Sequence, residues 1–249
     1  MKILFAGPTL FGETEGSALR AAPDISCPGP AGQGDIARAV LDGATSIGLV
    51  DGRYEDVAAP WHKEILFALS SGVRMFGAAS IGALRAAECE PFGMIGIGEI
   101  FERYRSGELV DDSDVAQLHA PEELSYLPLT EALVNVEATL RNLVEKGEID
   151  RQVVAQLQAA ARRIFFKDLT YDAVLACSGL GAAERDAVAA AIARGKVDLK
   201  RRDAHALVDV MIAQPDVRQT GHRDWRMATP PVWTRFMHAL EAARAQPSR

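Results

Sequence analysis

A single serine, Ser80, lies among small residues where a predicted strand changes into a predicted helix. Residues 73–76 have the apolar character of a buried strand, and residues 81–88 show helical spacing in an alanine-rich stretch. The first turn of a helix leaves backbone N–H groups unpaired, and such groups stabilise an oxyanion. The run Ala78-Ala79-Ser80-Ile81-Gly82 is related to the small-x-Ser-x-Gly turn that exposes a nucleophilic serine. The alternative interpretation is that Ser80 is the N-cap of an ordinary helix.

A nucleophilic serine needs a base, because its hydroxyl is almost fully protonated at neutral pH. Two candidates, His62 and Lys63, fall in the first turn of a helix that Pro60 opens. The positive end of the helix dipole and burial both disfavour an ammonium, which would suit Lys63 to act as the base. The alternatives are a surface lysine and a capping or structural histidine. A Ser-His-Asp triad that uses Asp51 with His62 or His119 is a rival that the spacing does not single out.

The sequence gives little sign of a metal or cofactor site. The five histidines are scattered without the spacing of metal ligands, at His62, His119, His205, His222 and His238. The first loop, residues 7–12, lacks both a GxGxxG pattern and a Walker lysine. Binding of an anion through the backbone amides of this loop is a weaker possibility. We therefore expect no metal and no cofactor.

The composition is that of an ordinary globular protein, with 48% hydrophobic and 24% charged residues in a chain of 249. A net charge of −7 gives no electrostatic reason to expect nucleic acid as a partner. The three cysteines, Cys27, Cys89 and Cys177, are odd in number and widely spaced, which fits a reducing cytoplasm. The apolar start is broken by Gly7-Pro8, so we interpret it as a first strand rather than a signal peptide. No apolar run has the length that a membrane span requires.

The first half of the chain alternates strand and helix patterns. Strands are predicted at residues 2–6, 46–50 and 73–76, and helices at residues 35–41, at residues 60–69 and after Ser80. This alternation predicts an α/β core domain over residues 1–125, with a small parallel sheet flanked by helices. Functional sites of such sheets lie at the carboxyl ends of the strands. Gly7-Pro8-Thr9, Asp51-Gly52 and Ala79-Ser80 all fall there.

The second half, residues 126–249, is predicted to be mainly helical and packed against the sheet. The helical segments are residues 129–145, 150–166, 182–194, 204–212 and 232–245. The acidic stretch at residues 107–114 and the basic stretch at residues 194–202 are interpreted as solvated surface.

Several motifs follow one another in a specific order in the first half. They are Asp51-Gly52, then Trp61-His62-Lys63-Glu64-Ile65-Leu66, then Phe76-Gly77-Ala78-Ala79-Ser80-Ile81-Gly82-Ala83-Leu84-Arg85-Ala86-Ala87-Glu88. Residues 96–101 and the acidic residues 111–116 continue the pattern. This ordered set resembles the core of the TfuA-like proteins.

The resemblance implies a cytoplasmic partner of YcaO enzymes, which activate a peptide backbone amide with ATP and install a thioamide. It implies hydrolysis of the thiocarboxylate of a small ThiS-like sulfur carrier, which releases sulfide for YcaO. The family's proposed Ser–Lys pair corresponds to Ser80 and Lys63. Binding or supporting roles are expected for residues around this pair, namely Asp51, Gly52, His62, Gly77, Ala79, Ile81 and Arg85. The alternative function is that of a non-catalytic adaptor that docks YcaO and its peptide substrate.

Overall fold

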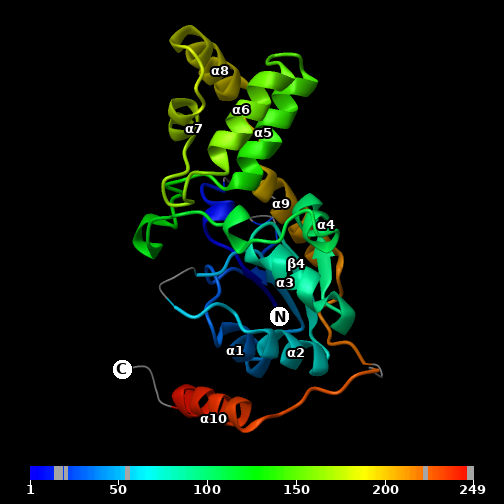
Figure 1. Cartoon of the computed structure of the whole chain (residues 1–249). Coiled ribbons are helices and arrows are strands. Elements are labelled where there is room, and N and C mark those ends of the chain that lie inside the picture. Colours follow the sequence, from blue (N-terminus) through cyan, green and yellow to red (C-terminus); the bar gives the residue numbers. More distant parts are fainter. Residues whose placement is uncertain (14–18, 20–21, 54–56, 221–223, 246–249) are drawn as a thin grey trace.

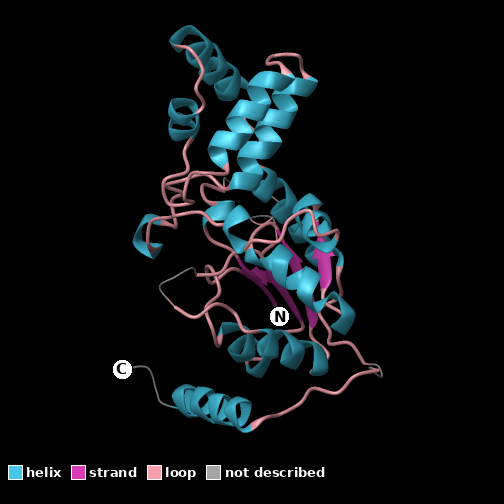
Figure 2. Cartoon of the chain, viewed as in Figure 1, coloured by secondary structure: helices cyan, strands magenta, loops and turns pink. Residues whose placement is uncertain are grey.

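The computed structural model describes residues 1–13, 19, 22–53, 57–220 and 224–245. Its centre is a parallel five-stranded sheet with the order β2-β1-β3-β4-β5 (Figures 1 and 2). The strands are β1 (Lys2–Phe5), β2 (Ile25–Ser26), β3 (Ser46–Leu49), β4 (Arg74–Ala78) and β5 (Ile95–Ile97). The chain adds β2 outside β1 on one side, and β4 and β5 outside β3 on the other, so the strand order reverses between β1 and β3. Doubly wound sheets have their ligand sites at this reversal point. The predicted α/β fold with a helical second half is confirmed.

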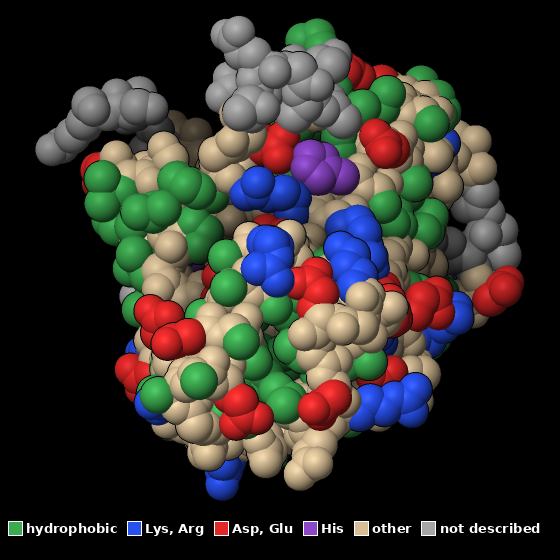
Figure 3. Space-filling view, turned by 90° about the horizontal axis from the view of Figure 1, so that it is seen from above, with side chains coloured by type: hydrophobic (Ala, Val, Ile, Leu, Met, Phe, Trp, Pro, Cys, Tyr) green, Lys and Arg blue, Asp and Glu red, His purple; other side chains and the backbone are tan. Residues whose placement is uncertain are grey.

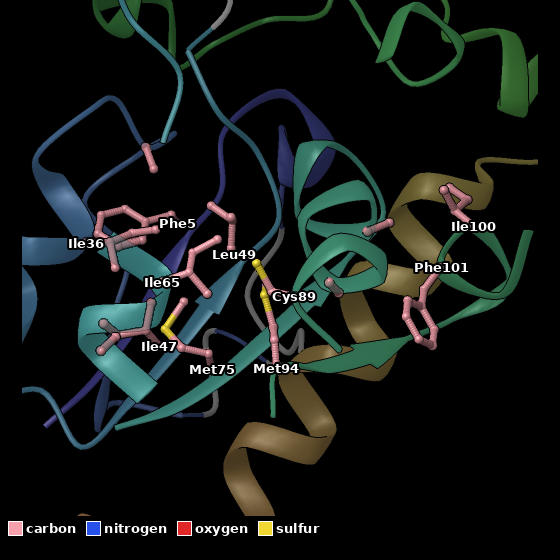
Figure 4. Close-up of a cluster of buried hydrophobic side chains, with 14 of the residues drawn as sticks. Phe5, Ile36, Ile47, Leu49, Ile65, Met75, Cys89, Met94, Ile100 and Phe101 are labelled. Carbon is pink, nitrogen blue, oxygen red and sulfur yellow. The ribbon is translucent and has the colours of Figure 1, made fainter. Parts of the chain in front are cut away.

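Alternate residues of the strands face the two layers of helices. On one face Ile3, Phe5 and Leu49 pack against α1 (Asp35–Leu41), α2 (His62–Ser70) and α3 (Ile81–Cys89) (Figure 4). On the other face Leu4 and Phe76 pack against α9 (Leu199–Ala213). A parallel sheet covered on both faces needs apolar residues at nearly every strand position, and these strands have them.

A second hydrophobic core lies in a group of helices that projects from the sheet, at the top of Figure 1. It comprises α5 (Leu133–Glu145), α6 (Arg151–Ala161), α7 (Tyr171–Cys177) and α8 (Ala182–Gly195). The last helix, α10 (Pro231–Ala245), lies at the opposite end, where Trp233 packs near Trp61 and Phe67. Helix α4 (Glu99–Arg105) follows β5 and packs beside α3.

Several predicted boundaries differ from the observed ones for local reasons. The helix predicted from residue 129 begins at Leu133, and the residues before it pair with other segments, Leu129 N–H with the Leu118 carbonyl and Glu131 N–H with the Leu169 carbonyl. The helix predicted from residue 204 begins at Leu199, because Asp198 caps it through a bond from the Arg201 N–H. The predicted boundary at residue 125 stays a prediction. Helix α9, from the second half of the chain, completes the cover of the sheet.

The surface seen from above carries basic and acidic side chains between patches of hydrophobic ones (Figure 3). Positive and negative side chains are therefore mixed on this face. None of the helices in the described part of the chain has the length and hydrophobicity of a membrane span.

Candidate active site

Ser80 lies in a sharp turn between β4 and α3. The preceding residue, Ala79, has a φ of 66°, a left-handed conformation that residues other than glycine seldom adopt. Ser80 occupies the N-cap position of α3, but its side chain makes no capping hydrogen bond. Its hydroxyl instead donates to the carbonyl of Val115 over a long 3.5 Å. The side chain is thus held away from the role that the N-cap interpretation gave it.

The small residues around Ser80 are required by close backbone approach. A Cβ at Gly82 would lie 1.8 Å from the carbonyl oxygen of Leu49, and a Cβ at Gly77 would lie 2.1 Å from that of Gly82. Neither atom has room, since such contacts are far inside van der Waals distance. The first turn of α3 therefore rests directly on the end of β3, which places Ser80 at the carboxyl edge of the sheet.

Ser80 lines a small pocket at this edge, together with Asp51, Gly52, Ile81 and Lys200. The pocket has a volume of about 30 Å³, which is room for little more than a water molecule. The remaining lining comes from the first loop and from the chain after α4, at Pro8, Asp112, Val115, Ala116, Gln117 and His119.

Lys200 is the lysine that the fold brings to Ser80. Its ammonium is buried and donates to the Val115 carbonyl at 3.0 Å and to Gln117 Oε1 at 3.4 Å. Because Ser80 Oγ donates to the same carbonyl, the two side chains are separated by at most the sum of two hydrogen-bond lengths. Burial lowers the pKa of Lys200 below its ordinary value, although the nearby carboxylates, Asp51 foremost, oppose this. A lysine in this environment is suited to act as a base.

Asp51 organises the first loop. One of its oxygens accepts the backbone N–H groups of Gly7 at 2.9 Å and Thr9 at 3.0 Å, and the other accepts the Thr9 hydroxyl at 2.7 Å. Asp51 also lies 3.9 Å from the Lys200 ammonium. The amides considered above for binding an anion are therefore occupied by a carboxylate of the protein itself.

Two backbone N–H groups at the pocket remain without an acceptor among the described residues, those of Gly52 and Ile81. Ile81 is the first residue of α3, where the helix leaves N–H groups unpaired. Both residues line the pocket beside Ser80. They are the donors available to a carbonyl oxygen that becomes negatively charged there.

The structure does not bring Lys63 to this pocket. Lys63 donates to the carbonyl of Ala228 at 2.6 Å, so it secures the chain that leads into α10. The expectation that it pairs with Ser80 therefore stays a prediction without support from the geometry. Its physical basis, an amine at a helix N-terminus, applies instead to Lys200 in the first turn of α9.

The remaining predicted site residues divide between the pocket and the surface. His62 and Arg85 both bind Glu88, at 2.8 Å and 2.6 Å, on a half-exposed surface that links α2 with α3. His119 does line the pocket, and its Nδ1 contacts the Ala120 carbonyl at 2.8 Å. The rival triad would need a bond from His119 to Asp51, and the described residues contain no such bond.

Lys200 was not among the predicted site residues, because residues 194–202 were interpreted as solvated surface. A signal was present in the helical spacing. Lys200 shares one face of α9 with four buried apolar residues, Ala204, Leu207, Val208 and Met211. A charged residue on the apolar face of a helix is unusual, and here it marks the site.

Fold and site together define a doubly wound α/β protein with a serine and a buried lysine at its topological switch point. Residues 51–170 match the sequence model of the TfuA-like proteins, and the chain is a TfuA-like protein. A separate comparison with curated proteins gave no match. The match includes Ser80 and the predicted motifs, whereas Lys200 lies beyond it. Family membership supports a role in the YcaO thioamidation system.

Proposed function

We propose that this chain is an accessory hydrolase that acts in the cytoplasm beside a YcaO enzyme. In this proposal it releases sulfide from the thiocarboxylated terminus of a ThiS-like carrier protein, and YcaO uses the sulfide in peptide backbone thioamidation. Ser80 is the nucleophile. Lys200, rather than Lys63, is the base.

The observation that supports the proposal most is the shared acceptor of Ser80 and Lys200. Both side chains reach the Val115 carbonyl in one pocket, so a movement that brings Nζ within hydrogen-bond reach of Oγ would allow a proton to pass between them. The lowered pKa of Lys200 increases the fraction of neutral amine at neutral pH. The turn at Ala79 also resembles the strained turns that carry nucleophilic serines in other hydrolases.

The chemistry follows in two steps. Neutral Lys200 accepts the Ser80 proton while Oγ bonds to the thiocarboxylate carbon. The C–S bond then breaks as the Lys200 ammonium passes this proton to the sulfur, which releases hydrosulfide, leaves an acyl ester on Ser80 and restores the neutral amine. Lys200 next accepts a proton from water, whose oxygen attacks the ester carbon. Ser80 leaves with a proton from Lys200, and the carrier regains a carboxylate. The N–H groups of Gly52 and Ile81 stabilise the oxyanion of both steps.

A second candidate function is that of a non-catalytic adaptor for YcaO. The observation in its favour is the limited access to Ser80, which is 9% exposed and lies in a pocket of about 30 Å³. A carrier terminus does not fit this space unless neighbouring residues move.

The two candidates differ in one measurement, sulfide release from a thiocarboxylated ThiS-like carrier. Catalysis predicts that Ser80→Ala abolishes release while binding of a YcaO enzyme persists. Ser70→Ala is the matched control, because the exposed Ser70 hydroxyl donates to the Phe67 carbonyl of its own helix and to Met227 Sδ and does not line the pocket. Equal release by the parent and by Ser80→Ala would favour the adaptor.

A further inference from the structure

Residues 110–129 form a surface segment with an unusual composition. The segment contains five acidic residues, Asp111, Asp112, Asp114, Glu122 and Glu123, and no lysine or arginine. None of these carboxylates takes part in a salt bridge with another described residue. The segment also exposes large apolar side chains, among them Val110 at 73%, Leu124 at 60% and Leu129 at 51%. Exposed apolar side chains beside acidic ones are typical of an interaction surface.

The second part of this segment, residues 118–129, folds back on itself, and we call it the hairpin. Its two arms are joined by the Ala120 N–H to the Leu127 carbonyl and by the Leu129 N–H to the Leu118 carbonyl, both at 2.8 Å. It turns through Ser125 and Tyr126, which both have positive φ. In Figure 1 this green segment projects from the side of the molecule, below the group of helices formed by α5, α6, α7 and α8. Its exposed leucines thus stand away from either hydrophobic core.

The first part, residues 111–117, covers Ser80, and we call it the lid. Val115 and Ala116 are buried, and the Val115 carbonyl lies where it accepts bonds from both Ser80 and Lys200. The lid is fastened at its start by the Tyr104 hydroxyl, which donates to the Asp111 carbonyl at 2.7 Å. At its end Gln117 donates to the Thr130 carbonyl at 2.7 Å.

The lid also occupies the polar groups of both side chains. Lys200 donates to the Val115 carbonyl and to Gln117 Oε1. The Ser80 proton points to the same carbonyl instead of to the amine. Withdrawal of the lid removes two acceptors of Lys200 at once and opens the pocket to a carrier terminus.

We propose that the hairpin docks a partner protein whose contact surface is apolar and bordered by lysine or arginine side chains, and that docking withdraws the lid from Ser80. The hairpin and the lid are continuous in the chain, so a displacement of Leu118 is transmitted directly to Gln117. The acidic side chains of the segment disfavour a nucleic acid or an anionic membrane as the occupant, because both carry the same sign of charge. This inference rests on the proposed function, which supplies two partners to test: a YcaO enzyme and a ThiS-like carrier.

Hydrogen–deuterium exchange tests the inference without depending on the chemistry of Ser80. We expect addition of a purified YcaO enzyme or ThiS-like carrier to slow amide exchange in residues 118–129 and to accelerate it in residues 112–117. If neither protein slows exchange in the hairpin, the docking proposal is overturned. If the hairpin is protected while exchange in the lid stays unchanged, the coupling is overturned.

Two sets of variants make the test specific. Glu122→Lys with Glu123→Lys should weaken partner binding at least tenfold, because like charges then face each other. Leu124→Ser with Leu129→Ser should weaken it comparably by removing apolar contact area. Val232→Ser and Glu241→Lys, on the exposed side of α10, are the matched controls and should leave binding unchanged. Equal losses of binding in the hairpin variants and in the α10 controls would contradict the assignment.

The lid itself is tested by Tyr104→Phe, which removes its first fastening. We expect exchange in residues 112–117 to rise at least tenfold, and labelling of Ser80 by a fluorophosphonate to rise with it. Tyr171→Phe is the control, since it removes a similar hydrogen bond of a tyrosine hydroxyl, to Thr139, between α7 and α5. Faster exchange without any labelling of Ser80 would support the lid and contradict the hydrolase. Unchanged exchange would contradict the lid.

Discussion

Ser80 and Lys200 donate hydrogen bonds to one acceptor, the carbonyl oxygen of Val115, at 3.5 Å and 3.0 Å. They reach it from elements more than a hundred residues apart in the chain. The relationship gives the proposed hydrolase a base that the sequence alone did not identify.

Replacement of the two lysines separates the predicted base from the observed neighbour. Lys200→Met should lower the rate of sulfide release by a factor of about 10²–10⁴, the range typical of a lost general base. Lys63→Met should leave the rate within a few-fold of the parent, because Lys63 binds the Ala228 carbonyl. The comparison is made by single-turnover sulfide release at fixed pH. The opposite order of effects would restore Lys63 as the base.

The rate should depend on pH through the same side chain. Since the pKa of Lys200 is lowered by burial, the rate should rise with pH through a basic limb that lies below the ordinary lysine range. His119→Gln tests the competing histidine, which lines the same pocket. If the rise of the rate with pH persists in Lys200→Met and is lost in His119→Gln, the base is His119.

Stability should change with pH in a direction that the lowered pKa fixes. Between the pKa of Lys200 in the folded protein and its value of about 10.4 in the unfolded chain, the unfolded state binds more protons. The free energy of unfolding therefore gains a contribution from Lys200 as pH rises through that window. Urea titrations of the parent and Lys200→Met measure it as a difference that shifts in favour of the parent as pH rises. A constant difference would show that the pKa is not lowered.

The contact between α3 and β3 predicts a strong effect of one added methyl group. In Gly82→Ala the new Cβ would lie 1.8 Å from the Leu49 carbonyl oxygen, so the helix or the strand must shift. We expect a loss of about 1–3 kcal/mol or more in the free energy of unfolding. Gly181→Ala is the control, because the nearest atom to its Cβ is 3.8 Å away, and it should cost no more than about 1 kcal/mol. Thermal or urea unfolding compares the two, and similar losses would contradict the close approach.

The buried carboxylate of Glu64, in α2, links the N-terminal ends of α1 and α2. Its oxygens accept the backbone N–H groups of Gly34 at 2.9 Å, Ala37 at 3.2 Å and Trp61 at 3.1 Å. Glu64→Gln replaces one acceptor oxygen with a donor, which should destabilise the protein by about 1–3 kcal/mol. Glu145→Gln, an exposed change in α5, should have no measurable effect in the same unfolding experiment. No difference between the two would mean that these bonds contribute little.

Local patterns were sufficient to predict much of the sheet and its first helices. The helix at residues 35–41 was predicted with its observed bounds, and β1, β3 and β4 were placed within one or two residues. Each has a continuous apolar pattern that ends at glycine, proline or a charged residue. Strands β2 and β5 have only two and three residues, and β5 contains Gly96, so neither carries a periodic signal of its own.

The site was predicted only in part, because it joins distant segments. Ser80, Asp51 and Gly52 were placed correctly at one edge of the sheet, since the carboxyl ends of parallel strands share that edge. Which lysine meets Ser80 depends on how α9 crosses the opposite face, and no local pattern in residues 194–202 specifies that crossing. The position of Val115 likewise depends on packing of the chain after α4.

The position of α9 also has a consequence for synthesis of the protein. The sheet begins with β1 at Lys2–Phe5, yet the helix that covers its second face is completed only at Ala213. A nascent chain must therefore hold Leu4 and Phe76 uncovered until more than four-fifths of the polypeptide has left the ribosome. The same helix carries Lys200, so a product truncated before α9 would be aggregation-prone and would also lack the base of the proposed hydrolase.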